Sequence, residues 1–216
     1  MASLHRIALV RHGQTEWSAS GQHTSTTDID LTDEGVHQAV SVAGLLWGLD
    51  LQPQTVWSSP RRRARRTAKL AGLRVDEIVD DLAEWSYGEY EGLTSKQIHE
   101  TNPGWSIFAD GAPGGESPEQ VATRVDRVLA RAREKLVDGD VALFCHGHIS
   151  RVLAVRWVGL PVTAGALVLM NPAAVTVLGT YHDAPAIEHA NVVPFHPPRL
   201  QHGEDGADAG VAVQTP

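Results

Sequence analysis

The sequence predicts an α/β fold, a three-layer sandwich in which a mostly parallel central sheet lies between two layers of helices. Short apolar runs at residues 7–10, 55–58 and 141–144 have the length of buried strands. Segments with helical periodicity separate these runs, and no internal repeat is present. Alternation of this kind favours parallel strands joined by helices that cover both faces of the sheet.

The expected strands occur at intervals along the chain. They cover residues 4–10, 55–58, 75–79, 140–145, 174–181 and 187–193. Residues 13–30 form a connection rich in Ser, Thr and Asp. This connection is long for a plain loop, and it is therefore a candidate binding loop.

Capping residues and apolar spacing mark the first two helices. Thr32 is a suitable N-cap for the first helix. Its predicted apolar face consists of Val36, Val40, Ala43 and Trp47. Pro60 suits the first turn of the next helix, and Gly72 is expected to end it.

The later helices include the most regular pattern of the chain. Residues 94–100 predict a short helix, and residues 101–115, with two prolines and four glycines, predict a loop or lid over a site. The clearest helix covers residues 118–137, and the last covers 149–158. The apolar stripe of the clearest helix is Val121, Val125, Val128, Leu129, Ala132 and Leu136.

Composition indicates a globular protein. At 216 residues, with 42% hydrophobic and 20% charged residues, the chain suits one domain, which we place at residues 1–195. Residues 196–216 have little apolar content and are expected to be a disordered tail. The one cysteine, Cys145, excludes an internal disulfide, and its position at a strand end predicts a buried thiol that serves in packing.

Charge and hydropathy argue against two classes of partner. The net charge of −8 argues against nucleic-acid binding. No apolar run approaches membrane-spanning length, and the N-terminus lacks a signal-peptide stretch, so we expect a cytoplasmic protein with no membrane partner. A homodimer is compatible with the sequence. Five of the six residues 61–66 are arginine, and one or two of them are expected to reach an anion-binding pocket.

Two histidine-glycine motifs follow predicted strands. Arg11-His12-Gly13 comes directly after residues 7–10, and His146-Gly147 follows the run at 141–144. Ligands bind at strand ends in open α/β sheets, so both histidines are expected to face one anion. One imidazole can attack phosphorus, and a second can stabilise the equatorial oxygens.

These motifs resemble those of the histidine phosphatase superfamily, also called the phosphoglycerate mutase-like family. Four segments carry the resemblance in the family's order, namely Leu9–Trp17, Ser58–Ala68, Glu84–Gly92 and His146–His148. The similarity extends from about residue 4 to residue 193 and is closest to actinobacterial acid phosphatases of the family, then to its sugar-bisphosphatase branch. It implies a phosphoglycerate mutase-like fold.

The resemblance assigns His12 as the phosphate acceptor. As the neutral imidazole, His12 can attack phosphorus in line and form a phosphohistidine. Its other ring nitrogen is expected to donate to a backbone carbonyl, such as that of Gly13, which fixes the tautomer. Arg11, Arg63 and His146 are expected to bind the phosphoryl oxygens. The choice of Arg63 follows the family pattern, which places the pocket arginine directly before Ala64.

Glu84 is the candidate general acid. It matches the first residue of the family's Glu-x-x-Tyr-Gly segment, whereas Glu89 and Glu91 fit positions downstream of it. A protonated Glu84 can supply a proton to the leaving group, and its carboxylate can then activate water. The apolar neighbour Trp85 is expected to favour the protonated form, so hydrolysis should be faster at mildly acidic pH.

A second group of residues is expected to contact phosphate or substrate. This group comprises Gln14, Ser18, Thr24, Ser25, Tyr87, Gly147 and His148. Two positions depart from the family pattern: Ser18 stands where mutases usually have Asn, and Ser25 stands where many members have Gly. No metal-ligand spacing, dinucleotide-binding glycine pattern or Walker-type phosphate loop is present, so neither metal nor cofactor is expected.

Three functions are compatible with these residues. The first is a metal-independent phosphatase that hydrolyses small phosphorylated metabolites such as sugar phosphates through a phosphohistidine on His12. The second is a phosphoglycerate mutase, and the third is a non-catalytic phosphate-binding module. Between residues 94 and 120 the only Lys or Arg is Lys96, and the segment also contains the apolar residues Trp105, Ile107 and Phe108. A mutase must hold a doubly phosphorylated intermediate, so this segment favours hydrolysis, with substrates that carry a hydrophobic or variable leaving group.

Overall fold

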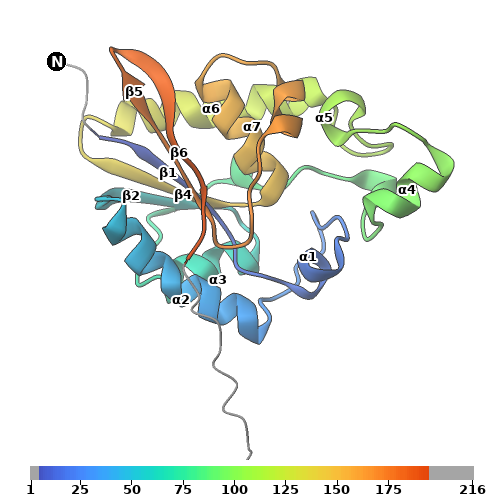
Figure 1. The fold of residues 1–216 in the computed structure, drawn as a ribbon, viewed down its shortest axis with the longest axis horizontal. Helices are drawn as coiled ribbons and strands as arrows, with labels where there is room; N and C mark the ends of the chain where they lie inside the picture. The colour runs from blue at the N-terminus through green and yellow to red at the C-terminus, as the bar shows by residue number, and fades with distance from the viewer. Residues whose placement is uncertain (1–4, 195–216) are drawn as a thin grey trace, which may run out of the picture.

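The computed structural model describes residues 5–194, and within them the strands form one six-stranded sheet (Figure 1). The strands are β1 (Ile7–Arg11), β2 (Pro53–Ser58), β3 (Glu77–Ile78), β4 (Asp140–Cys145), β5 (Val175–Tyr181) and β6 (Ala184–Val192). Their order across the sheet is β3-β2-β4-β1-β5-β6. The first four strands pair in parallel, whereas β5 and β6 are antiparallel. The mostly parallel sheet is therefore confirmed, with an antiparallel pair at one edge.

The helices alternate with the strands as predicted. They are α1 (Glu16–Ser20), α2 (Asp33–Gly48), α3 (Arg62–Leu70), α4 (Ser95–Thr101), α5 (Ile107–Asp110), α6 (Pro118–Lys135) and α7 (Gly147–Trp157). Short 3-10 segments form η1 (Asp80–Leu82), η2 (Gly88–Tyr90) and η3 (Val162–Leu167). Two segments expected as loops contain short helices. The 13–30 connection contains α1, which Thr15 and Ser18 cap reciprocally, and the predicted lid at 101–115 contains α5.

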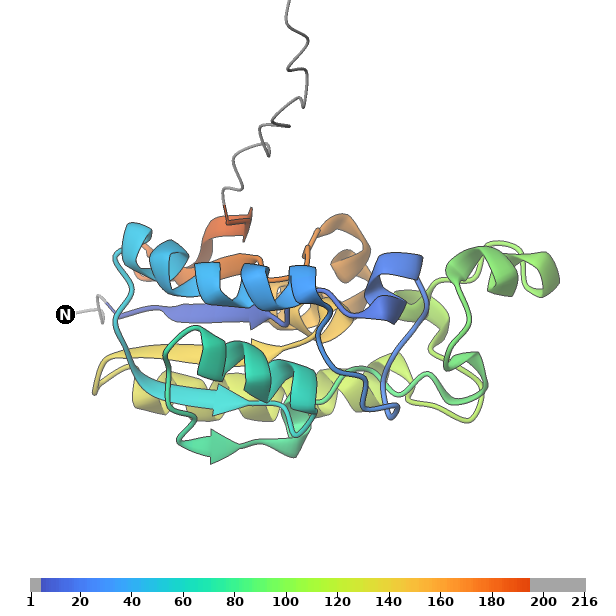
Figure 2. The ribbon, with the colours of Figure 1, turned by 90° about the horizontal axis from the view of Figure 1, so that it is seen from below.

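Two layers of helices cover the sheet. Helices α2 and α3 lie on one face, and α6 and α7 lie on the other (Figures 1 and 2). In β1, Ile7 and Leu9 belong to the apolar cluster that includes α6 and α7, whereas Ala8 and Val10 belong to the cluster that includes α2 and α3. Alternate side chains of a buried strand thus pack on opposite layers, as a three-layer sandwich requires.

Helix α2 buries a different face from the predicted one. Val40 is 53% exposed and Trp47 is 77% exposed. The buried side is instead formed by Gly35, Ala39, Val42 and Leu46. This stripe lies one residue earlier in the sequence, a rotation of about 100° around the helix axis. Both stripes are apolar, and the one with smaller residues allows α2 to approach the sheet closely.

Helix α6 agrees with its prediction, and the segment before it does not. Ser117 caps α6, and the whole predicted apolar stripe is buried. Trp105, Ile107 and Phe108, however, are also buried in the core beside α6 and α7. They do not line the cavity as an apolar lid, so they give no support to the expectation of a hydrophobic leaving group.

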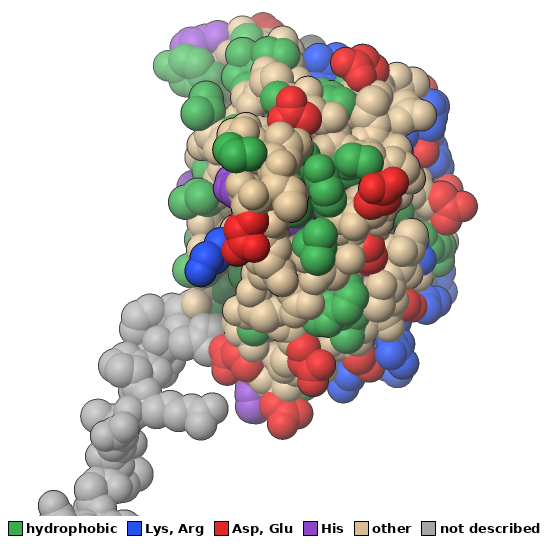
Figure 3. Space-filling model, turned by 90° about the vertical axis from the view of Figure 1, so that its right-hand side faces the viewer, with side chains coloured by type: hydrophobic (Ala, Val, Ile, Leu, Met, Phe, Trp, Pro, Cys, Tyr) green, Lys and Arg blue, Asp and Glu red, His purple; other side chains and the backbone are tan. Residues whose placement is uncertain are grey.

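The parallel strands bring both histidine motifs to one edge of the sheet. Arg11 pairs with Cys145 in the register of β1 and β4, so His12 and His146 leave the sheet side by side. Helices α1 and α4 lie beyond this edge (Figure 1). The surface seen from that side carries acidic side chains beside Lys and Arg (Figure 3).

Among residues 5–194, no helix combines the length and the apolar character needed to cross a membrane. The predicted tail, residues 196–216, lies outside the described residues.

Candidate active site

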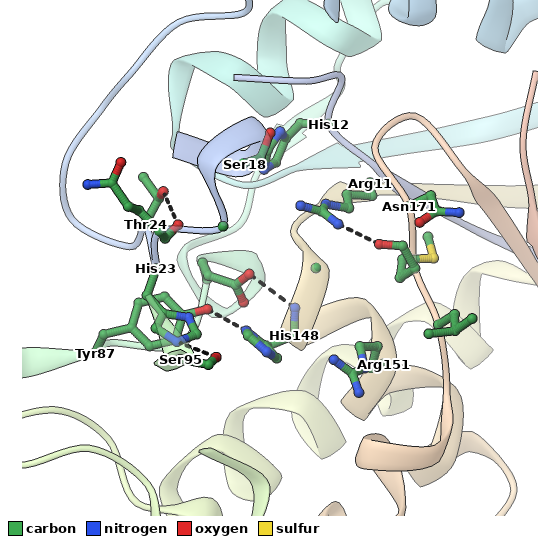
Figure 4. Close-up of a pocket in the computed structure, with 16 residues that line it drawn as sticks. Arg11, His12, Ser18, His23, Thr24, Tyr87, Ser95, His148, Arg151 and Asn171 are labelled. Atoms are coloured by element: carbon green, nitrogen blue, oxygen red, sulfur yellow. Dashed lines mark hydrogen bonds between the residues drawn. The ribbon is translucent and has the colours of Figure 1, made fainter. Parts of the chain in front are cut away.

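A cavity of about 320 Å³ opens at the ends of β1 and β4 (Figure 4). Eight predicted site residues line it: Arg11, His12, Ser18, Thr24, Glu84, Tyr87, Gly147 and His148. Sequence reasoning missed a further group of lining residues, which includes Gln22, His23, Ser95, Arg151, Leu169 and Asn171. Such a cavity at the carboxyl edge of a parallel sheet is the expected position for a ligand site.

His12 presents one ring nitrogen to this cavity. Its Nδ1 lies 2.7 Å from the carbonyl oxygen of Gly13. A carbonyl only accepts, so Nδ1 carries the proton and Nε2 holds a lone pair. Within residues 5–194, no protein group hydrogen-bonds to Nε2. The predicted contact with Gly13 is therefore present, and it leaves Nε2 available to attack an electrophile.

The surroundings of His12 keep its imidazole neutral. Its pKa is well below the ordinary value of 6.5, chiefly because the ring is buried. The positive charges of Arg63 and Arg11 lower the pKa further, and the bond to the Gly13 carbonyl opposes them only in part. These effects favour the neutral form of the His12 imidazole, which is its nucleophilic form.

Arg11 crosses the wall of the cavity beside the start of α7. Its Nη1 donates to the carbonyl of Met170 over 2.6 Å, and its Nε is buried without a partner. A Cβ built on Gly147 would lie 3.3 Å from the guanidinium carbon of Arg11. The glycine thus makes room for the side chain of Arg11. The unpartnered N–H groups of Arg11 suit an anion.

Glu84 is positioned by backbone N–H groups. Its carboxylate accepts hydrogen bonds from His148 and Ile149 in the first turn of α7, and from Trp85. The side chain of His146, the N-cap residue of α7, makes no capping bond, so Glu84 supplies the acceptor that the helix needs. These three polar contacts hold the carboxyl group at the cavity.

Arg63 lies behind His12 rather than in the cavity. It is fully buried, and its Nη1 and Nη2 donate to the carbonyls of Thr27 and Thr24 over 3.1 and 3.0 Å. Its Nε donates to Nδ1 of His146. The side chain of Arg63 is not among the residues that line the cavity. Arg63 instead ties the 24–27 loop to the sheet edge and places a positive charge near His12.

His146 is also fully buried, next to His12. The two ring centroids are 5.2 Å apart, with the planes at 65°. Because Nδ1 accepts from Arg63, Nε2 carries the proton and donates to Oγ of Ser59, 2.7 Å away. Both ring nitrogens are occupied by protein groups, so His146 supports the first histidine and does not line the cavity.

Some residues of the second predicted group line the cavity, and others bond only to the segments around it. Ser18 and Thr24 line the cavity, but the hydroxyl of Ser18 also caps α1 and that of Thr24 donates to the Gln22 carbonyl. Gln14 and Ser25 do not line it. The Gln14 side chain accepts from Thr32, and Ser25 bonds to the carboxylate of Glu91. Both side chains therefore serve as supports of the loop and helix around the cavity.

Tyr87 and His148 form a linked pair at the cavity. The Tyr87 hydroxyl lies 2.5 Å from Nδ1 of His148. Burial, with the nearby charge of Glu84, raises the pKa of Tyr87 well above 10, so the phenol keeps its proton. The hydroxyl has no other acceptor within the described chain and donates to Nδ1, which places the proton of the neutral His148 on Nε2.

The lining residues that sequence analysis missed carry weak signals. His23 lies within the 13–30 connection that was singled out as a binding loop, but a histidine in a polar loop is not distinctive by itself. Arg151 is three residues after His148 and therefore on the same face of α7. That spacing, applied to the helix after the second histidine motif, could have identified it.

Together these features define an α/β protein built to receive an anion beside a neutral histidine. Two arginines that line the cavity, a buried carboxyl group and an open imidazole nitrogen are groups suited to phosphoryl transfer by covalent catalysis. Within residues 5–194, no cluster of three or more His, Cys, Asp or Glu side chains is arranged to hold a metal ion.

The chain belongs to the histidine phosphatase superfamily. The model of that superfamily's branch 1 matches residues 7–193. An acid phosphatase of Mycobacterium tuberculosis is 47% identical over 178 residues, which are 82% of this chain and 88% of the relative. A sedoheptulose 1,7-bisphosphatase of Saccharomyces cerevisiae is 37% identical over 187 residues, with 73% of this chain and 69% of the relative covered.

Solved structures agree with this assignment. The structure of an open reading frame product of Mycobacterium tuberculosis matches this chain with a TM-score of 0.87 and 44% sequence identity. The match covers 89% of this chain and 100% of the solved chain. A mycobacterial glucosyl-3-phosphoglycerate phosphatase has a TM-score of 0.74 and 30% identity, with 87% and 99% covered. The predicted family, fold class and phosphatase type are therefore confirmed.

Proposed function

We propose that this protein hydrolyses small phosphomonoesters through a phosphohistidine on His12, with Glu84 as the acid and base. The observation that carries the proposal is the fixed tautomer of His12, which leaves Nε2 open to the cavity while burial and two arginines keep the ring neutral. The names of the relatives, which are phosphatases of sugars and other small metabolites, support the same class of substrate.

In the first step, Nε2 of His12 attacks phosphorus and the bond from phosphorus to the ester oxygen breaks. The leaving oxygen takes a proton from Glu84 and departs as an alcohol. The unpartnered N–H groups of Arg11 face the phosphoryl oxygens and stabilise their charge as it develops. The Gly13 carbonyl stabilises the positive charge that His12 gains.

In the second step, the carboxylate of Glu84 takes a proton from water, and the oxygen of that water attacks phosphorus. The bond from phosphorus to Nε2 breaks, which releases inorganic phosphate and restores neutral His12 and protonated Glu84. Arg63 and His146 act as positioning residues, because Arg63 bonds to His146 and to the 24–27 loop, and His146 packs against His12.

Phosphate release from several monoesters tests the proposal. Release should proceed in EDTA, because arginine side chains supply the positive charge at the site. It should exceed isomerisation of 3-phosphoglycerate measured with added 2,3-bisphosphoglycerate. Dependence of phosphate release on magnesium would contradict the metal-independent mechanism, and isomerisation faster than release would establish a mutase instead. If neither reaction occurs, the third function, a non-catalytic phosphate-binding module, would replace the proposal.

Three sequence predictions accompany this function. The cytoplasmic location is tested by fractionation of the source cells, and the homodimer by light scattering of the purified protein. The single domain at residues 1–195 predicts that a chain ending at residue 195 keeps the melting temperature of the full chain.

A further inference from the structure

Helix α2 presents an apolar stripe to solvent that the proposed function does not use. This stripe is Val36, Val40, Ala43 and Trp47, which the sequence predicted to be buried. Trp47 is 77% exposed and Val40 is 53% exposed. Figure 2 shows α2 along its length on the outer side of the sheet. None of the four side chains lines the cavity that holds His12.

The outer side of α2 differs in charge from that of α6, which covers the other face of the sheet. Between residues 35 and 49 the chain has no Lys, Arg, Asp or Glu. The exposed side of α6 is charged instead, and its Arg127 and Arg131 pair with Asp81 and Glu77. A surface helix normally has a polar outer face. An uncharged outer face with large apolar side chains is typical of a surface that another molecule covers.

The charge of the whole chain restricts where two copies can meet. In a two-fold dimer the same patch of both copies forms the contact, so any charge on the patch faces a like charge nearby. Each chain carries a net charge of −8, and contact through an acidic surface would be repulsive. The stripe of α2 has no charge that could repel its copy. Self-association is therefore permitted at this face.

The spacing of residues along α2 is complementary to itself. A two-fold axis that passes between Ala43 and Gly44, perpendicular to the helix, makes the two copies of α2 antiparallel. Val40 then faces Trp47 of the second copy, because both lie equally far from the axis. A Cβ built on Gly44 would meet nothing within 4 Å. The small residues at the crossing thus leave room for the two helices to approach closely.

The same register places complementary polar groups at both ends of the contact. His37 and Asp50 are exposed, and they lie equally far from the axis in opposite directions. His37 of each copy therefore faces Asp50 of the other. An imidazole N–H can donate to a carboxylate, so the apolar centre has a polar pair at either end. This match of the patch with its own copy identifies a second chain as the occupant.

A groove extends the patch beside the stripe. It has a volume of about 360 Å³ and is lined by Ser41, Gly44, Leu45, Val193 and Pro194. Ser41 adjoins Val40, so the groove opens where Trp47 of the second copy arrives in this register. A buried tryptophan removes about 150–250 Å² from water, and a standard interface needs roughly 800 Å² from each partner. One helix and one groove supply less than that area, so the expected dimer is weak.

We propose that the outer face of α2 is the contact surface of a homodimer in which two copies of α2 cross antiparallel. This α2 face consists of His37, Val40, Ala43, Gly44, Trp47 and Asp50. Its dissociation constant is on the order of 10–100 μM, because the contact is small but has a tryptophan at its centre. The inference does not depend on the proposed hydrolysis, since the cavity is lined by other residues.

Sedimentation at increasing protein concentration tests the association. The average mass of the wild-type protein should rise from that of one chain toward that of two between about 1 and 500 μM. Trp47→Glu should raise the dissociation constant about tenfold or more, because it removes the central ring and opposes two like charges. Val137→Glu, at an apolar position that is 78% exposed after α6, is the control and should associate like the wild type. Both variants should keep the melting temperature of the dilute wild-type protein.

Engineered cysteines test the antiparallel register. The native Cys145 does not interfere, because it is buried and burial raises its pKa to about 12. Ala43→Cys lies next to the axis and should form a disulfide with its own copy when diamide is added. In Val40→Cys the two thiols lie about 10 Å apart along the helices, which exceeds the reach of a disulfide, so linking should be at least about tenfold slower. Parallel helices would instead link both variants.

Each other outcome contradicts the proposal. A wild-type protein that stays monomeric over this concentration range overturns the dimer, and unchanged association of a folded Trp47→Glu overturns the α2 face. Equal or faster linking of Val40→Cys overturns the register. If only a chain that ends at residue 195 associates, the remaining residues of the chain cover the α2 face in the full-length protein, and the proposal is wrong. The cysteine variants decide the question even if Trp47→Glu fails to fold.

Discussion

The two histidine-glycine motifs occupy equivalent places in the fold but have different neighbours. Each follows a buried parallel strand, and the strands are adjacent, with Arg11 paired to Cys145. His12 uses one ring nitrogen for the Gly13 carbonyl and presents the other to the cavity. His146 uses both of its nitrogens, for Arg63 and for Ser59, and is fully buried.

This difference shows that position at a strand end does not determine the role of a histidine. Both rings have a lowered pKa, chiefly because of burial and then because of Arg63, so electrostatics alone does not separate them. Access to the cavity separates them, because only a ring with a free nitrogen can form a bond to phosphorus. The sequence motif therefore identifies the pair, and the local hydrogen bonds distinguish the ring with an open nitrogen from the ring without one.

Replacement of each histidine in turn should give the largest difference between His12 and His146. His12→Ala should lower phosphate release on the order of 10⁴-fold and remove acid-labile labelling from a phosphorylated substrate, because the nucleophile is gone. His146→Gln can still accept from Arg63 and donate to Ser59, so it should slow release on the order of 100-fold and still become labelled. Rapid-quench labelling measures both. Labelled His12→Ala would reverse the assignment, and an unlabelled but folded His146→Gln would show that His146 contacts the reacting group.

A smaller effect is expected from substitution of Arg63, whose positive charge lowers the pKa of both His12 and His146. Arg63→Gln removes a positive charge that lowers the pKa of His12, so that pKa should rise. Because attack needs neutral His12, the acid limb of the profile of kcat/KM against pH should move to higher pH, with release reduced on the order of tenfold to 100-fold. Arg65→Met, at an exposed position of the same helix, should leave the profile unchanged. An unchanged acid limb in a folded Arg63→Gln would mean that Arg63 acts through the 24–27 loop alone.

Sequence patterns sufficed for the layers of the fold and not for every helix face. The apolar strands and the stripe of α6 were evident, because each has one strong periodicity. In α2 two adjacent apolar stripes compete, and the choice depends on how closely the helix packs against the sheet, which a single sequence does not encode locally. The antiparallel β5 and β6 likewise depend on pairing between segments far from β1 in the chain.

The same distinction applies to the candidate site. Arg11, His12, Glu84 and His148 were predicted from motifs, and all four line the cavity. Arg63 and His146 were identified as well, but their burial depends on the carbonyls of the 24–27 loop and on Ser59, which no motif indicates. Arg151 was missed although its helical spacing from His148 was a signal, and its contacts with Phe108 and Gly165 arise only from folding.

The smallest effect is expected from substitution of Gly147, the glycine that follows His146 in the second histidine motif. Gly147→Ala places a Cβ about 3.3 Å from the guanidinium carbon of Arg11, so Arg11 must shift by a few tenths of an ångström. We expect KM for a phosphomonoester to rise by roughly two- to fivefold with little change in kcat, because Arg11 binds phosphate in the ground state as well as in the transition state. Gly44→Ala on α2, where a Cβ meets nothing within 4 Å, is the matched control. It should leave KM unchanged and add up to about 1 kcal/mol to the free energy of unfolding, since alanine favours a helix. Equal KM values for the two variants would show that Arg11 reaches the phosphate without depending on the space that Gly147 provides.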